Sequence, residues 1–189
     1  MKKFKILLFI VLIGITATAQ KYTKTENSNV TKEWNGNTFS SSNSLAENIA
    51  VAPDLSLMYK ALEDKTILNA LESEEMVTVF VISNKGFTKL REKKDSIFDT
   101  SKANLLTAIV TYHAIPGRVD SHSIKKAAKR NDGITYYATL QGGKLGIKEE
   151  NGQLVLVDPQ GNTSVISATD FYHKNGFFHI VDGIVFPEM

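Results

Sequence analysis

Histidine and aspartate are the residues of this sequence whose types and spacing could carry chemistry. The candidates are His113, His122, His173, His179, Asp170 and Asp182. If several of them converged, they could ligate a metal ion or act as an acid–base pair. The spacing does not require convergence, and a histidine near an aspartate more often makes structural hydrogen bonds. A His/Asp metal-binding protein or hydrolase is therefore kept as an alternative; its set would be His113, His173, His179 and Asp182.

Motifs of the common enzyme classes are absent from the sequence. It contains no Cys, which excludes a thiol nucleophile, a disulfide scaffold and zinc sites built on thiolates. It also lacks a G-x-S-x-G elbow, a G-x-x-x-x-G-K-[ST] phosphate loop, an H-E-x-x-H helix and a G-x-G-x-x-G turn. Ser83, Ser121 and Thr78 are predicted to be cap or strand hydroxyls, so they are weak nucleophile candidates. We expect no catalytic residue, no metal and no cofactor.

Residues 1–19 show the features of a secretory signal peptide in their usual order. Three lysines precede an uncharged apolar run over residues 6–15, and Ala17 and Ala19 stand where signal peptidase requires small residues. The apolar run is about half of the ~20 residues that span a bilayer. We expect cleavage after Ala19 and secretion to the periplasm, the cell surface or the medium. No second long apolar segment follows, so we expect no membrane span after cleavage.

Removal of this segment changes the charge balance. The full chain has 22 Lys and Arg against 20 Asp and Glu, and residues 1–19 hold three Lys and no acid. The remainder is slightly acidic, with 19 basic and 20 acidic residues. Nucleic-acid binding rests on a basic surface, so we expect no nucleic-acid partner. A basic cluster at Lys125, Lys126, Lys129 and Arg130 fits the solvated face of a short helix.

The rest of the chain divides into an arm and a domain. Residues 20–43 are polar, end in a Ser-rich run and lack periodicity, which is typical of a linker or a loosely docked arm. Order begins at Ser44, where the sequence Ser-Leu-Ala-Glu fits a capping box. We therefore expect one domain over residues 44–189.

Helical periodicity dominates the first half of this domain. One helix face is formed by Leu55, Met58, Tyr59 and Leu62, and residues 67–71 predict another short helical turn. Residues 76–82 are β-branched and aromatic and predict a buried strand, with Ser83 capping the helix after it. Further helices are predicted from Ser101 to Pro116 and after Ser123. His113 lies on an apolar helix face, so we expect a partly buried ring that is hydrogen-bonded to backbone.

After Asn131 the pattern changes from helix to strand. Predicted strands cover residues 134–140, 144–148, 153–157, 163–168 and 177–181. The turns between them are Gly142-Gly143, Asn151-Gly152, Asp158-Pro159-Gln160-Gly161 and Asn175-Gly176. Asn-Gly between two strand-like runs is a strong hairpin signal, because both residues tolerate positive φ. The sequence therefore predicts an α+β domain in which helices precede an antiparallel meander.

Four segments of this domain resemble signatures of the fasciclin domain. The first is Thr78-Val79-Phe80 followed by Phe87 and Leu90, and the second is Tyr112-His113 followed by Pro116-Gly117. The third is Thr139-Leu140-Gln141-Gly142, and the last is NGFFHIVDGIVFP over residues 175–187. The resemblance covers residues 44–189 in the order of the family. It implies an antiparallel β-sheet wedge with helices packed at one side.

The resemblance also implies roles for individual residues. The structural set is Thr78, Phe80, Asn175, His179 and Asp182. We expect His179 to pair with Asp182, and Asp182-Gly183 to turn the last strand back to the first. In some animal members a Tyr-His pair and an Asp-Ile pair bear on receptor binding. The matching positions here are Tyr112, His113, Asp170 and Phe171.

The resemblance implies an exported, non-enzymatic module for adhesion or ligand binding. Its partner would be a protein or a polysaccharide at the cell surface or in the matrix. The second hypothesis is a structural envelope protein that binds another exported protein through the arm 20–43. The third is the metal-binding protein or hydrolase considered above.

Overall fold

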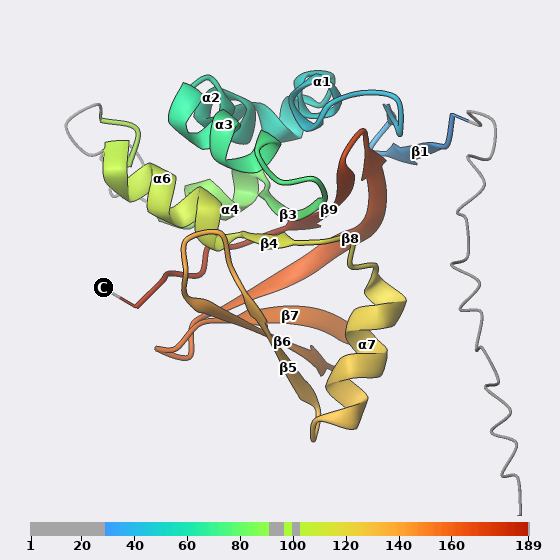
Figure 1. Ribbon diagram of the computed structural model, residues 1–189, viewed down its shortest axis with the longest axis vertical. Helices are drawn as coiled ribbons and strands as arrows, with labels where there is room; N and C mark the ends of the chain where they lie inside the picture. The colour runs from blue at the N-terminus through green and yellow to red at the C-terminus, as the bar shows by residue number, and fades with distance from the viewer. Residues whose placement is uncertain (1–28, 91–96, 100–102, 189) are drawn as a thin grey trace, which may run out of the picture.

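The computed structural model describes residues 29–90, 97–99 and 103–188 (Figure 1). The predicted signal segment 1–19 and the start of the arm lie outside these residues. The helical elements are α1 (Leu45–Ala50), η1 (Pro53–Leu55), α2 (Ser56–Leu62), α3 (Lys65–Glu72), α4 (Asn84–Thr88), α6 (Ala103–Tyr112) and α7 (Ser121–Arg130). The strands are β1 (Thr31–Trp34), β2 (Asn37–Ser40), β3 (Val77–Ile82), β4 (Ala114–Pro116), β5 (Ile134–Ala138), β6 (Lys144–Glu150), β7 (Gln153–Val157), β8 (Thr163–His173) and β9 (Gly176–Val181).

Strands β1 and β2 form a hairpin where the composition predicted a linker. They pair antiparallel around Asn35 and Gly36, whose φ values are 48° and 75°. Phe39 is 1% exposed, and its ring lies 5.1 Å from the rings of both Phe171 and Phe178. The expectation of a linker or loose arm is therefore wrong over residues 31–40, because a buried aromatic side chain ties the hairpin to the domain.

The larger sheet of the described residues has the strand order β4-β3-β9-β8-β7-β6-β5. Its neighbouring strands are antiparallel except for β3 and β9, which run parallel with Val79 opposite Phe178. The predicted α+β class is confirmed, but the expected antiparallel sheet is mixed, because it contains the parallel pair β3–β9. A long connection through the helices and the meander separates β3 from β9, so a parallel pairing is possible. Asp182-Gly183 follows β9 and does not turn that strand back to β3.

Strand β8 is longer than predicted and bends along its length. Its first residues pair with β7, and the residues from Ile166 onward pair with β9. The pairing is irregular between Ile166 and Ala168 and between Ala168 and Phe171, and Asp170 has a φ of 60°. These irregularities redirect the strand, so that β5, β6 and β7 form one end of the sheet and β3, β4 and β9 the other (Figure 1).

Most helices lie at one end of the sheet. Helices α1, α2 and α3 lie together above β3 and β9, whereas α7 packs beside β5 and β6 (Figure 1). The capping box at Ser44 and the cap at Ser83 are both confirmed. Helix α7 begins earlier than predicted, because Asp120 rather than Ser123 is its N-cap. Among the described residues, none of the helices is both long enough and apolar enough to cross a membrane.

The hydrophobic core surrounds the parallel pair. All six residues of β3 and all six residues of β9 are buried. Leu55, Met58 and Ile67 cover this pair from the helical side with no exposed surface. Removal of this much apolar surface from water is the main force that holds the wedge together.

Candidate ligand-binding site

The first signature places two residues where they join β3 to its neighbours. The Thr78 hydroxyl donates to the Gly117 carbonyl at 2.7 Å and accepts from the Val119 amide at 2.9 Å. Phe80 stacks on the ring of His179, with the two ring centroids 5.5 Å apart. Both residues therefore brace the parallel pair and the chain that follows β4, and neither side chain is exposed.

His179 is a buried, neutral bridge between β8 and the chain that follows β4. Its Nδ1 accepts from the Asp170 amide at 3.1 Å, so its Nε2 carries the proton and donates to the Val119 carbonyl at 2.9 Å. Burial lowers the pKa of His179, against the opposing effects of the Val119 bond and the Asp170 carboxylate. Both ring nitrogens are thus occupied by backbone groups in the folded protein.

Asp170 connects the bend of β8 to the start of α7. Its carboxylate accepts hydrogen bonds from the amide and the hydroxyl of Ser121. Burial alone would raise the pKa of Asp170, but the bonds from Ser121 outweigh it and the pKa is lowered. The side chain remains 29% exposed, so part of it faces solvent.

The other three predicted binding residues lie in the core. Tyr112 donates its hydroxyl to the Lys144 carbonyl at 2.7 Å, and burial raises its pKa to about 12. His113 Nδ1 donates to the Ile109 carbonyl at 2.8 Å, and burial lowers the pKa of His113 to about 4. Phe171 stacks on Phe178 at 5.0 Å. Because none of the three is more than 1% exposed, we assign them no direct contact with a partner in this conformation.

Asp182 does not pair with His179, contrary to the expectation from sequence. Its carboxylate accepts from the hydroxyls of Ser83 and Ser167 at 3.1 and 3.0 Å and from Lys85 Nζ at 2.9 Å. Burial opposes ionisation, but the bonds from Lys85 and the two serines outweigh it, so the pKa of Asp182 is lowered. His179 and Asp182 are three positions apart, and side chains alternate between the two faces of a strand, so the two side chains point to opposite faces. His179 therefore lies beside Asp170 instead.

Asn175 closes the turn between β8 and β9. Its carbonyl accepts from the Val77 amide at 2.9 Å, and its side chain donates to the Glu74 carbonyl at 3.4 Å. The next residue is Gly176, where a Cβ atom would lie 1.8 Å from the Val77 carbonyl oxygen. The Asn-Gly pair therefore lets the closing turn approach the backbone of β3 closely.

The set for a metal site is not assembled in the described part of the chain. His113 contacts Ile109, His179 contacts Val119 and Asp170, and Asp182 contacts Ser83, Ser167 and Lys85. His173 donates through Nε2 to the Phe177 carbonyl at 3.2 Å. Within residues 29–90, 97–99 and 103–188, no three His, Asp or Glu side chains gather where they could hold an ion.

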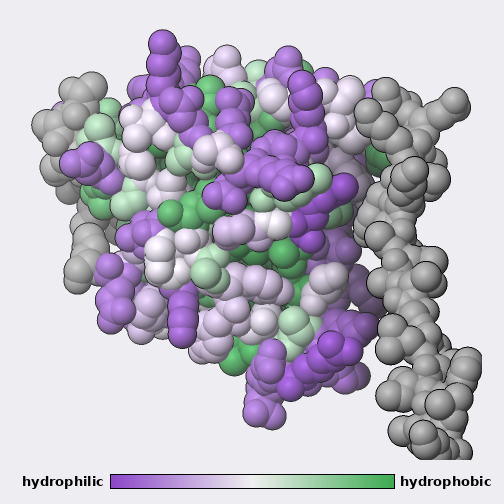
Figure 2. All heavy atoms as spheres, viewed as in Figure 1, coloured by the Kyte–Doolittle hydropathy of each residue, from purple (hydrophilic) through white to green (hydrophobic). Residues whose placement is uncertain are grey.

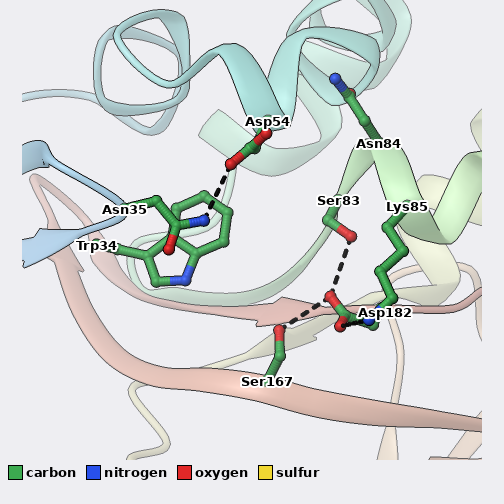
Figure 3. Close-up of a pocket in the computed structure, with 8 residues that line it drawn as sticks. All are labelled: Trp34, Asn35, Asp54, Ser83, Asn84, Lys85, Ser167 and Asp182. Carbon is green, nitrogen blue, oxygen red and sulfur yellow. Dashed lines mark hydrogen bonds and ion pairs between the residues drawn. The ribbon is translucent and has the colours of Figure 1, made fainter.

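A pocket lies beside Asp182, between the N-terminal hairpin and the domain (Figure 3). Its volume is about 330 Å³, and its lining residues are Trp34, Asn35, Asp54, Ser83, Asn84, Lys85, Ser167 and Asp182. Figure 3 shows Ser83, Ser167 and Lys85 converging on Asp182, with Trp34 and Asn35 entering from the hairpin. The Asn35 amide donates to the Asp54 carboxylate at 2.9 Å, which closes the hairpin against η1. The pocket thus combines an aromatic ring with fixed hydrogen-bonding groups.

Most residues of this pocket were not predicted from the sequence as site residues. Asp182 was predicted only as a structural residue. Trp34 and Asn35 lie in the segment interpreted as a linker, although Asn35-Gly36 is the same hairpin signal that predicted the turn between β6 and β7. Asp54 and Ser167 carry no local signal for a shared site. They meet Asp182 and Trp34 only through the packing of distant elements.

Comparison with models of protein families shows which family this chain belongs to. Residues 53–187 match the family model described as the fasciclin domain. The chain belongs to the fasciclin domain family. The hairpin β1–β2 precedes the matched fasciclin region, so Trp34 and Asn35 are contributed to the pocket from outside it.

Similar proteins carry the fasciclin region in chains of different lengths. The chain is 24% identical over 135 residues to Protein sll1483 of Synechocystis sp., covering 71% of this chain and 68% of that one. It is 29% identical to the fasciclin-like arabinogalactan protein CTB11 of Cercospora beticola and to human periostin, covering 67% and 70% of this chain. The match spans only 30% of CTB11 and 16% of periostin.

A solved structure shares the fasciclin fold. It is the FAS1 domain pair from the insect cell adhesion molecule Fasciclin I, with a TM-score of 0.65 and 17% sequence identity. The similarity covers 77% of this chain and 51% of the insect chain. Fasciclin domains therefore occur in a cell adhesion protein, and the wedge described above is their fold.

Proposed function

We propose that the protein is an exported, non-enzymatic module of the fasciclin type that binds a protein or polysaccharide at the cell surface or in the matrix. The family match over residues 53–187 carries this proposal. The features of a signal peptide in residues 1–19 support export. The structural envelope protein remains an alternative in which the partner is another exported protein.

The hydrogen bonding of the signature residues supports a binding role over a catalytic one. His113 and His179 use their ring nitrogens on backbone groups in the core, so neither faces a substrate. Loops and turns on such a frame are the usual carriers of recognition. On the face seen in Figure 2, hydrophobic residues form small patches separated by hydrophilic ones, which fits a partner held by polar contacts.

A binding assay with the exported form tests this proposal. Purified protein of residues 20–189 is incubated with the cell-envelope and matrix fraction of the producing organism, and retention is measured after washing. We expect saturable retention of the folded protein and none of the heat-unfolded protein. Absence of retention, or equal retention of the unfolded protein, would contradict the proposal.

Treatment of the fraction identifies the class of partner. Protease should abolish retention if the partner is a protein, and periodate, which cleaves sugar diols, should abolish it if the partner is a polysaccharide. Export has its own readout, because the mature protein should begin at Gln20. A mature protein that keeps Met1 would contradict export.

Asp170 is the predicted binding residue that reaches the surface, and we propose it as the direct contact from that set. Asp170→Asn removes the charge while its side chain can still accept from Ser121. We expect about tenfold weaker retention, with a fall in melting temperature that leaves the protein folded under the assay conditions, since the charge-assisted bonds to Ser121 are weakened as well. Glu63→Ala on the exposed end of α2 is the matched control. Equal retention of the two variants would remove Asp170 from the proposed contact.

A further inference from the structure

The pocket between the hairpin and the fasciclin region has one wall that the family match does not cover. Trp34 and Asn35 come from the tip of the β1–β2 hairpin, whereas the other lining residues lie within 53–187. The docked hairpin therefore creates the pocket, because without it Asp54 and Asp182 would border open solvent on that side. A volume of about 330 Å³ is at the small end of the ~300–1,000 Å³ found for small-molecule sites.

Trp34 supplies a rigid aromatic surface in this pocket. Its side chain is half-buried and its ring packs on that of Phe39, with centroids 6.5 Å apart and planes inclined by 25°. Phe39 is itself fixed in the core, so the indole is held in place before any ligand binds. The face of an aromatic ring carries negative charge, which attracts the weakly positive C–H groups on the face of a pyranose ring.

The polar groups of the pocket are suited to bind the hydroxyl groups of a ligand. The Asp182 carboxylate is held by Ser83, Ser167 and Lys85, so its orientation and those of the two hydroxyls are fixed. On the opposite wall, the Asn35 amide and the Asp54 carboxylate form a second fixed pair. Each set offers acceptors beside donors, and a sugar hydroxyl both donates and accepts.

The charges of the lining residues favour a neutral ligand. Two carboxylates, Asp54 and Asp182, face one ammonium group, that of Lys85, so an anionic sugar would meet net repulsion. Lys85 is bonded to Asp182 at 2.9 Å and neutralises it, which removes much of the attraction for a cation. Asp54 is exposed to water, where screening weakens its attraction for a cation further.

We infer that this pocket binds a neutral saccharide unit, with one pyranose ring stacked on Trp34 and its hydroxyls bonded to Asp54 and the Asp182 group. The inference rests on the proposed binding function and names the ligand class of this pocket. Since the wall that carries Trp34 lies outside the matched fasciclin region, the specificity belongs to this chain's hairpin.

Fluorescence titration tests the inference directly, because Trp34 is the single tryptophan of the sequence. The probes are cellobiose, maltose and N,N′-diacetylchitobiose as neutral disaccharides, glucuronate as an anion and choline as a cation. We expect a saturable change in Trp34 emission with at least one neutral disaccharide, in the millimolar range typical of a small polar ligand. No saturable change with any disaccharide, or a response to glucuronate or choline alone, would overturn the inference.

Variants locate the binding. Asp54→Asn lies on the surface and should keep the melting temperature while weakening the binding of the active disaccharide about tenfold. Trp34→Ala, followed by saturation-transfer NMR, should lose that binding, and Trp34→Phe should retain part of it. The control is Tyr136→Ala, a 63% exposed aromatic residue on β5 beside a different hollow. If Tyr136→Ala abolishes the binding while Asp54→Asn does not, the pocket is not the site.

The two proposals fail in different experiments. If folded Trp34→Ala protein is retained by the envelope fraction as well as the wild type, and no disaccharide titrates, only the saccharide inference is overturned. If disaccharides titrate but the fraction never retains the protein, the proposed adhesion function fails and the saccharide site stands.

Discussion

At the scale of single residues, the buried histidines make stability depend on pH. The folded protein holds the pKa of His113 at about 4, whereas the unfolded chain titrates near the ordinary value of 6.5. Below pH 6.5 the unfolded state therefore binds the proton more readily, and stability falls as the pH drops toward 4. Burial lowers the pKa values of His173 and His179 in the same direction.

We predict that His113→Asn is less stable than the wild type at pH 7 but loses less stability on acidification. The contribution of His113 to the loss between pH 7 and 4 should be about 3 kcal/mol. Urea unfolding at pH 7 and at mildly acidic pH measures both effects. His122→Asn, at an exposed histidine of α7, is the matched control for loss of an imidazole. A His113 variant with the wild-type slope would show that this ring is not the titrating group.

Gly176 offers a second test at the residue scale. An added Cβ would lie 1.8 Å from the Val77 carbonyl oxygen, so β9 could not keep its distance from β3. We predict that Gly176→Ala lowers the free energy of unfolding by at least about 3 kcal/mol. At Gly142 an added Cβ meets nothing within 4 Å, so Gly142→Ala should cost only about 1–2 kcal/mol of backbone strain. Urea unfolding measures the loss of unfolding free energy in each variant. Comparable losses in the two variants would contradict the close contact between Gly176 and the Val77 carbonyl.

At the scale of elements, the hairpin β1–β2 has a buried aromatic anchor beside its surface hydrogen bonds. Phe39 packs its edges against Phe171 and Phe178, and most other hairpin residues are exposed. We predict that Phe39→Ala lowers the free energy of unfolding by about 3–5 kcal/mol, because it leaves a cavity among three rings. Thr38→Ala on the exposed face should change it by less than ~0.5 kcal/mol. A mild effect of Phe39→Ala in chemical denaturation would mean that the hairpin is only loosely attached.

At the scale of the whole molecule, hydrogen bonds join segments that are far apart in the sequence. Leu140 of the third signature donates to the Ala114 carbonyl at 2.9 Å, which joins the end of β5 to β4. Asp158 accepts from the Phe186 amide at 2.9 Å, which joins the turn after β7 to the C-terminal segment. These contacts couple the two ends of the wedge, so the domain should unfold as one cooperative unit.

The same reasoning predicts where this unit begins. A chain that starts at Ser44 lacks Phe39 and Trp34, so it should melt roughly 10 °C or more below the chain of residues 20–189. A chain that starts at Asn29 keeps the hairpin and should melt roughly 10 °C or more above the chain that starts at Ser44. Calorimetry measures the melting temperatures of the three chains. Equal values would mean that the folded domain begins at Ser44.

The sequence by itself determined the features that depend on neighbours along the chain. Helical periodicity, the Ser44 capping box and the Asn151-Gly152 turn act within a few residues, so most helices and strands of the domain were placed close to their observed bounds. The helix predicted up to Pro116 was wrong at its end, because α6 stops at Tyr112 and residues 114–116 pair with β3 as strand β4. The signatures also identified the family and the α+β class. The Asn35-Gly36 turn carried the same local signal, but the Ser-rich composition around it outweighed that signal in the prediction.

Only the tertiary structure decided which polar groups meet. Asp182 lies 99 residues from Ser83, and His179 lies 60 residues from Val119, so no spacing rule relates them. Their contacts follow from the parallel pairing of β3 with β9 and from the bend in β8. The same packing buries Tyr112, His113 and Phe171 and opens the Trp34 pocket, because long-range burial of apolar surface, rather than local propensity, fixes how these elements dock.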